Sequence, residues 1–355
     1  MIDLVSVPAD ELAHFTEQAF GSMGLSDESA RLCANALMYS ELRFHPGQGQ
    51  GVRRLPTYHE RLNKGLICPD APFDIVKQSP ALALVDGHNG LGSVIGQKAM
   101  ALAADKAKVC GIGTVVVRGS THYGSSAVHA NIALQHDCIG IAFTNAGPEM
   151  APWGGATAVV GTNPWAIAAP TGRGFPVVLD IALTTAGKGM MRWLERENKP
   201  MPRDWALTPE GEETKDPSAA MMGALLGIGQ YKGYGLSFMT DVLTGVLSGG
   251  AFGLTPYADP AKQDVAHTFI ALDIAWFMAL DDFKKRMDTL IAEVKSSQLR
   301  PGFDEILVPG ELEHRREQER RRDGVQLDTA VFDELENLSK TLNISFPFER
   351  DGLIL

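Results

Sequence analysis

Between residues 81 and 180 the sequence alternates short runs of β-branched and aromatic residues with alanine-rich segments. The runs LALVDG, TVVVRG and IGIAFTN are typical of strands, and residues 95–108 between the first two are typical of a helix. The runs VVGTNPWAIAAP and PVVLDIA follow with turns between them and no room for crossover helices, so these neighbours are expected to pair antiparallel. The pattern predicts an α/β protein with a mixed, largely antiparallel sheet.

The length of 355 residues favours two units with separate cores. Residues 1–75 are expected to form an N-terminal helical domain that the helices of residues 300–355 complete. Residues 76–299 are expected to form the α/β domain. Charges and prolines near residues 190–222 indicate a surface excursion from it.

Caps and apolar spacing place the first helix. Ser26 looks like a helix cap, and apolar residues follow at spacings of three and four as far as about Arg43. Three glycines and a proline then predict a shaped loop at residues 44–51.

Later helices are predicted by the same signals. The segment 233–250 reads as a glycine-rich apolar helix that packs tightly. Residues 283–294 carry an apolar helical face after Asp281 and Asp282, which can cap its amino end. Asp328 is expected to cap the last helix.

Charge and composition exclude several classes of protein. A net charge of −11 argues against nucleic-acid binding, and the one dense basic run, residues 314–322, contains acids and reads as a solvated helix face. No apolar stretch is long enough to cross a bilayer, and the first residues do not resemble a signal peptide. We expect a soluble cytoplasmic protein.

The four cysteines are far apart, with no spacing typical of a metal site: Cys33, Cys68, Cys110 and Cys138. They are expected to be reduced, buried thiols, and no metal is expected.

The string GSTHYGSSAVHA at residues 119–130 is the most suggestive for chemistry. It places glycine and small hydroxyl residues where a strand ends and a helix begins, which suits an anion. The same residues also fit a capped helix with a structural histidine. No GxGxxG follows any strand, and GHNGLG at residues 87–92 has the wrong spacing, so a standard Rossmann domain is not indicated.

Seven strings spread over nearly the whole chain resemble the malate/L-lactate dehydrogenase family, which includes ureidoglycolate dehydrogenase, diketogulonate reductase and piperideine-2-carboxylate reductase. They are GVRRLPTYHERL, GIGTVVVRGSTHYG, MAPWGG, GTNPWAIAAPTG, VVLDIA, YKGYGLSFMTDVLTGVLSG and VPGE. The resemblance implies a nicotinamide-binding fold without the glycine fingerprint, a homodimer, and a small carboxylated substrate used with NAD or NADP.

The resemblance also implies roles for individual residues. Arg54 would grip the substrate carboxylate, which suits a permanently charged planar group, whereas Arg53 would face solvent. The cofactor would be held by His122, Tyr123, Gly124, Ser125, Ser126, Thr144, Asp180, Ile181, Ala182, Lys232, Gly233, Gly310 and Glu311.

One departure from the family concerns its proton donor. Family members usually carry the histidine of a Ser-His-Gly triplet four residues before the substrate arginine, but here the triplet is Gly49-Gln50-Gly51. Glutamine donates hydrogen bonds but supplies no proton. Three interpretations follow: His122 is the acid and base, His45 reaches in from its loop, or the substrate needs no acid.

His122 is the preferred acid and base, because a histidine suits a two-way proton shuttle and this histidine is assigned that role in one branch of the family. Asp180 is expected to orient His122 or to balance a positively charged imine, and Gln50 to orient the substrate.

These residues predict an NAD(P)-dependent oxidoreductase that transfers hydride between nicotinamide and a small 2-hydroxy or 2-keto carboxylic acid. One alternative is a cyclic ketimine carboxylate reductase, because an iminium carbon accepts hydride without further protonation. An alternative of another class is a non-catalytic relative that binds a nucleotide or other ligand.

Overall fold

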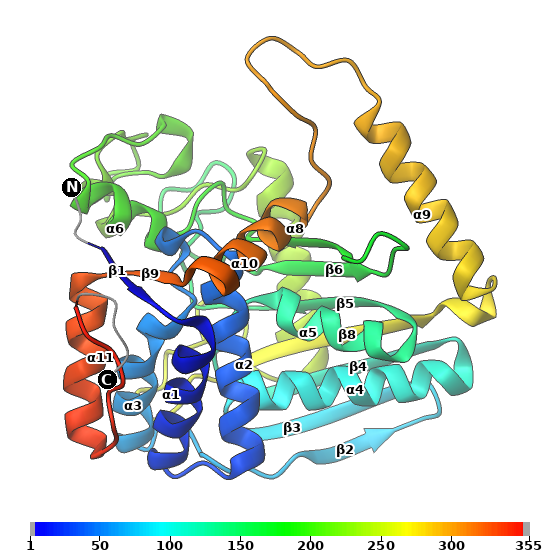
Figure 1. Cartoon of the computed structure of the whole chain (residues 1–355), viewed down its shortest axis with the longest axis horizontal. Coiled ribbons are helices and arrows are strands. Elements are labelled where there is room, and N and C mark those ends of the chain that lie inside the picture. Colours follow the sequence, from blue (N-terminus) through cyan, green and yellow to red (C-terminus); the bar gives the residue numbers. More distant parts are fainter. Residues whose placement is uncertain (1–3, 351–355) are drawn as a thin grey trace.

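The computed structural model describes residues 4–350 and is built around one seven-stranded sheet (Figure 1). Its strands are β2 (Asp74–Gln78), β3 (Leu82–Gly90), β4 (Ile112–Ser120), β5 (Cys138–Thr144), β6 (Trp165–Ala169), β7 (Val177–Ile181) and β8 (Val265–Asp273). Their order in space is β2-β3-β4-β8-β5-β6-β7. Only β3 and β4 pair parallel, and every other neighbouring pair is antiparallel. The predicted mixed α/β sheet is confirmed.

The one parallel pair requires a crossover, which the alanine-rich helix α4 (Gly92–Cys110) supplies. Its face of small residues, including Ala99 and Ala103, is fully buried. A Cβ on Gly113 in β4 would lie 1.9 Å from the Ala103 carbonyl oxygen, so glycine at this position permits the close approach of helix and strand. The short helix α5 (Ser126–Ile132) follows β4.

A second unit joins the two ends of the chain. It contains α1 (Ala9–Ser22), α2 (Asp27–Arg43), α3 (Leu55–Asn63), α10 (Glu311–Asp323) and α11 (Thr329–Leu342). β1 (Leu4–Val7) pairs antiparallel with β9 (Val325–Asp328). One apolar core contains residues from both ends, among them Phe15, Phe20 and Leu335. The helical unit built from both termini is confirmed, whereas its boundaries stay predictions.

Two of the expected helix caps are present. The Ser26 side chain accepts from the Ser29 N–H at 3.4 Å, and α2 ends at Arg43 as predicted. The Asp328 carboxylate accepts from the Val331 N–H at 2.8 Å at the start of α11.

The predicted cap of α9 (Leu280–Lys295) is wrong. The residue before the helix is Ala279, which offers no side-chain cap. Asp281 and Asp282 lie inside the first turn, where a negative charge still interacts favourably with the helix dipole.

The surface excursion near residues 190–222 packs around its own apolar side chains, whereas helix α8 leaves part of its apolar surface exposed. The excursion holds α6 (Lys188–Arg196) and α7 (Pro217–Met222), which share a small core of their own. α8 (Tyr231–Asp241) continues into a single π-helical turn, Val242–Val246. The expectation that this apolar helix packs tightly is wrong on one side, where Leu236, Phe238 and Met239 are exposed.

Short 3-10 turns occur at Pro46–Gln48, Val52–Arg54, Ala133–His136, Arg203–Trp205 and Ile274–Trp276. Within residues 4–350, no helix has both the length and the apolarity needed to cross a membrane.

Cys33 and Cys138 are buried as expected, but Cys68 is exposed, so the prediction of buried thiols is wrong there.

Candidate active site

His122 lies two residues beyond the end of β4 and is partly buried with its ring among other side chains. Its main-chain N–H donates to Gln263 Oε1 at 2.9 Å, and its Nδ1 lies 3.2 Å from the Tyr58 hydroxyl. Sequence reasoning missed both partners. Tyr58 follows Arg54 by four residues at the start of α3, so helical spacing was a usable signal for it.

Arg54 is the second charged group of the site. Its Nε donates to the Gly49 carbonyl at 2.8 Å, and among residues 4–350 neither terminal guanidinium nitrogen has a hydrogen-bond acceptor. Burial lowers its pKa, and the nearby Arg61 and Arg192 lower it further, although an arginine stays charged. The site therefore presents positive donors without a matching anion.

The pKa of His122 lies well below its usual range. The largest cause is burial, and the charges of Arg54 and Arg61 add to it. The ring is therefore neutral near pH 7. When the Tyr58 hydroxyl accepts from Nδ1–H, Nε2 is left as a proton acceptor.

An aromatic stack holds the His122 loop in place. The Tyr123 ring lies between the rings of His129 and His267, with centroids 4.3 and 4.6 Å away and interplanar angles of 20° and 6°. Its hydroxyl bonds Ser126 Oγ at 2.6 Å. The Tyr123 carbonyl accepts from His129 Nε2 at 3.0 Å, so both the side chain and the carbonyl of Tyr123 have partners inside the protein.

The segments expected to bind the cofactor meet around the end of β7. The Asp180 carboxylate accepts from the Ala127 N–H at 2.9 Å, which joins β7 to the start of α5. Gly310, with φ +85°, lies against Val178 so closely that a Cβ would be 3.0 Å from its backbone. A Cβ on Gly233 would lie 2.4 Å from the Leu183 carbonyl oxygen, just beyond Ala182. The chain thus gathers segments that are remote in sequence.

Several predicted cofactor residues have side chains that already have partners. The Thr144 hydroxyl is buried and bonds His267 Nδ1 at 2.7 Å. The Glu311 carboxylate pairs with Lys295 at 2.7 Å and Arg315 at 2.6 Å. Lys232 is exposed, at the start of α8. The side chains of Thr144 and Glu311 are thus occupied by partners of the described chain, whereas Lys232 forms no ion pair within residues 4–350.

The loop residues of the prediction lie in a different environment. His45 Nδ1 accepts from the Gly47 N–H at 3.0 Å, and its ring packs edge-on against Trp193. Gln50 lines a cavity of about 10 Å³ with His45 and Glu41, and its buried Oε1 has no donor within residues 4–350. No bond in the described chain joins either residue to His122.

Two expectations about charged neighbours change. Arg53 does not face solvent: it pairs with the buried Asp328 at 2.9 Å, so that prediction is wrong. Asp180 bonds the backbone of Ala127 rather than the His122 ring. Burial raises the pKa of Asp180 to about 7. Within residues 4–350, no hydrogen bond joins Asp180 to His122, so the expected orientation of the His122 ring by Asp180 stays a prediction.

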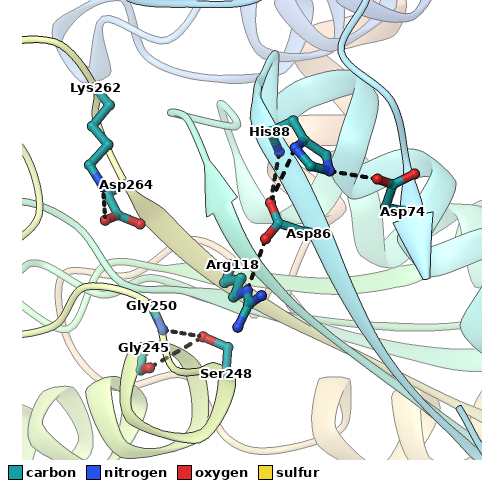
Figure 2. Close-up of polar contacts among 9 residues, drawn as sticks. All are labelled: Asp74, Asp86, His88, Arg118, Gly245, Ser248, Gly250, Lys262 and Asp264. Carbon is teal, nitrogen blue, oxygen red and sulfur yellow. Dashed lines mark hydrogen bonds and ion pairs between the residues drawn. The ribbon is translucent and has the colours of Figure 1, made fainter. Parts of the chain in front are cut away.

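A polar network fixes the strand ends that lead into the site (Figure 2). Arg118 on β4 pairs with Asp86 on β3 at 3.0 Å, and Asp86 also accepts from the His88 N–H at 3.1 Å. His88 Nε2 lies 2.7 Å from the Asp74 carboxylate on β2. The network thus ties three strands together, and Arg118 in it precedes His122 by four residues. Within residues 4–350, no group of His, Cys, Asp or Glu is arranged to hold a metal ion.

Comparison with known proteins assigns the chain. Residues 7–336 match the family model described as malate/L-lactate dehydrogenase. The malate dehydrogenase of Pyrococcus abyssi is 36% identical over 349 residues, covering 96% of each chain. The crystal structure of malate dehydrogenase from Entamoeba histolytica superposes with a TM-score of 0.94 at 31% identity, covering 97% of this chain and 100% of that one.

Further relatives carry a cofactor in their names. They are a (2R)-3-sulfolactate dehydrogenase (NADP(+)) of Chromohalobacter salexigens, 30% identical over 89% of this chain and 93% of its own, and a ureidoglycolate dehydrogenase (NAD(+)) of Escherichia coli, 28% identical over 92% and 94%. The protein is an NAD(P)-dependent oxidoreductase of the 2-hydroxy acid dehydrogenase class. Within that class, the chain belongs to the malate/L-lactate dehydrogenase family.

Proposed function

We propose that this dehydrogenase interconverts a small 2-hydroxy acid and its 2-keto acid, with the substrate carboxylate held by Arg54. The observation that carries the proposal is the pair of terminal guanidinium nitrogens of Arg54, which have no acceptor within residues 4–350 and lie near a neutral His122. A carboxylate supplies two acceptor oxygens that match the guanidinium. Bound NAD or NADP would accept or supply the hydride.

His122 is the proposed proton shuttle. In the oxidation direction its Nε2 takes the hydroxyl proton of the substrate, while Nδ1–H donates to Tyr58. In the reduction direction the imidazolium returns that proton to the carbonyl oxygen. A carboxylate on Arg54 offsets the charge that depresses the His122 pKa, so substrate binding favours the protonated ring.

A second acidic group on the substrate is also proposed. Arg61 depresses the pKa of His122 and of Arg54, and it forms no ion pair within residues 4–350. Malate and sulfolactate, which name several relatives, each carry such a second group. We therefore favour acids with another anionic group over a simple monocarboxylate.

Replacement of His122 by alanine tests the proposal. We expect the rate of hydride transfer in a single turnover with malate or sulfolactate to fall by roughly 10²–10⁴-fold, because proton transfer by a positioned side chain contributes about that much. For the intact enzyme, kcat/KM of oxidation should rise with pH and reach its plateau at a pH below 6.5. The reason is that the pKa of His122 in the substrate-free enzyme is lowered from its usual value. His59→Ala, at a half-buried histidine of α3 whose ring contacts Asn63 at 2.9 Å, is the control and should leave the rate unchanged. An unaltered rate in His122→Ala would refute the shuttle.

The ketimine reductase stays a second candidate because Gln50 replaces the usual proton donor of the family. Hydride addition to an iminium carbon needs no such donor. Parallel assays with a cyclic ketimine carboxylate and a 2-keto acid distinguish the two: turnover of the imine alone would favour the second candidate. Each relative named above is a dehydrogenase, so no observation favours a non-catalytic relative. The choice between NAD and NADP, and a cytoplasmic location, stay predictions.

A further inference from the structure

Gln263 lies just before β8, and only 3% of it is exposed. Its Oε1 accepts the hydrogen bond from the His122 main-chain N–H at 2.9 Å. A main-chain N–H can only donate, so the amide atom facing it must be the oxygen. This contact fixes which way the amide is turned and leaves Nε2 on its other branch.

Nε2 of Gln263 is a buried donor with no acceptor in the described chain, residues 4–350. Leaving such a group without a partner costs free energy of folding, and native proteins keep one only where something else satisfies it. The established partners of the site, His122 and Tyr58, do not use this atom. An acceptor from outside the chain would complete it.

The segment that carries Gln263 is closely held. Its carbonyl accepts from the Tyr257 N–H at 2.8 Å, which closes the loop between the two residues. Its neighbours Lys262 and Asp264 pair with each other at 3.1 Å (Figure 2). The amide is therefore positioned before any ligand arrives, which lowers the entropic cost of binding.

The groups around this amide call for an anion. Burial is the largest cause of the lowered pKa of both Arg54 and His122. In addition, Tyr257 raises the pKa of Arg54, and the charge of Arg54 lowers the pKa of His122, so these three side chains lie close together. The terminal nitrogens of Arg54 and Nε2 of Gln263 are all donors, and none has an acceptor within residues 4–350. A carboxylate, with about four lone-pair sites, can satisfy donors from two residues at once.

We propose that Gln263 is a further substrate-binding residue, whose Nε2 donates to the same carboxylate that Arg54 holds. The proposal rests on the proposed function. It adds a neutral donor that fixes the orientation of the carboxylate next to His122, whereas Arg54 alone supplies charge.

Two variants separate substrate binding from support of the His122 backbone. Gln263→Glu keeps an oxygen for the His122 N–H but removes the donor, and Gln263→Met removes both without adding charge. We expect KM for the 2-keto acid, and Kd for oxamate in the presence of reduced dinucleotide, to rise roughly 10–100-fold in both variants. The affinity for the dinucleotide alone should change less than about 3-fold. The melting temperature should fall in Gln263→Met and be largely kept in Gln263→Glu.

Gln97→Met is the matched control, because Gln97 is equally buried but both of its donor bonds end on carbonyls of Leu32 and Ser93. It should lower the melting temperature and leave KM unchanged. A higher KM in Gln263→Met cannot come from charge repulsion, because methionine is neutral. A higher KM in Gln263→Glu cannot come from a lost bond to the His122 N–H, because glutamate keeps an acceptor oxygen. Wild-type KM in either variant overturns the proposal. If the intact protein neither binds a reduced dinucleotide nor turns over any substrate, the proposed function itself fails.

Discussion

Burial decides the chemistry of single side chains at this site. His122 is held neutral because its ring is desolvated beside positive groups, and Asp180 is held partly protonated because its carboxylate is desolvated with one backbone donor. Burial therefore lowers the pKa of His122 and raises the pKa of Asp180. Residue type alone would have assigned a charged aspartate and a half-charged histidine.

Asp180→Asn tests the effect of this burial on stability. The native carboxyl keeps its proton up to about pH 7, whereas the unfolded one loses it near pH 4. Between these values the native state binds more protons, so the contribution of Asp180 to stability is full below pH 4 and is lost as the pH rises to 7. The ligand-free variant should gain stability relative to wild type across this window, by a few kcal/mol at most.

The measurement is the free energy of unfolding in urea at pH 4.5, 6 and 8. Asp10→Asn, at a side chain that is 99% exposed, should follow the wild-type curve. A constant difference between Asp180→Asn and wild type at all three pH values would contradict the raised pKa.

Some residues of the candidate site could be predicted from the sequence, and others could not. Arg54, His122 and Asp180 came from matched strings, and the structure brings Arg54 near His122. Gln263 could not be found, because 141 positions separate it from His122 and only the antiparallel path of β8 beside β4 joins them. The burial of Tyr123 between two histidines likewise depends on tertiary packing.

At the scale of elements, Asp328 links two functions. It caps α11 through the Val331 N–H, and its carboxylate also pairs with Arg53, next to Arg54, for which we propose the substrate-binding role. The end of the chain thereby holds the short turn that begins α3.

Variants at Asp328 separate the cap from the ion pair. Asp328→Asn keeps an acceptor for Val331 but removes the charge, so we expect a loss of roughly 1–3 kcal/mol for a largely buried pair. Asp328→Ala should lose about 1 kcal/mol more, the usual cost of a missing cap. Urea midpoints measure both. Asp323→Asn, in an exposed pair with Arg322, is the control and should leave the urea midpoint unchanged. Equal stability of Asp328→Asn and Asp328→Ala would rule out the cap contribution.

Caps and periodicity predicted most elements well, because these signals are local. They placed α2 and α11 correctly, and the antiparallel order of β5, β6 and β7 followed from the short connections. They could not say whether an apolar helix face is covered. α8 shows apolar side chains to solvent, although its composition indicated a tightly packed helix.

At the scale of the whole molecule, α9 and the segment that follows it extend away from the sheet (Figure 1). Of its apolar face only Ile291 is buried, whereas Leu290 is 53% and Val294 is 41% exposed. Phe303, beyond the helix, is exposed as well. An apolar surface of this kind marks an interaction site. We propose that a second copy of the chain covers it, which gives the homodimer that the family resemblance implies.

Charge on this face should break the dimer. The double variant Leu290→Glu with Val294→Glu is expected to sediment as a monomer of 38.2 kDa, whereas the wild type is expected to sediment at twice that mass. Thr289→Glu adds charge on the neighbouring, exposed side of α9 and serves as the control that remains dimeric. A monomeric wild type at micromolar concentration would contradict the proposal.

The pairing of β1 with β9 has a consequence for how the protein is made. β1 ends at Val7 and β9 begins at Val325, so a ribosome working at roughly 5–20 residues per second leaves the first strand waiting for tens of seconds. Phe15 and Phe20 stay without Leu335 for the same interval. The emerging chain thus offers chaperones an open apolar surface until synthesis is nearly over, and slower translation of the last hundred codons would lengthen that exposure.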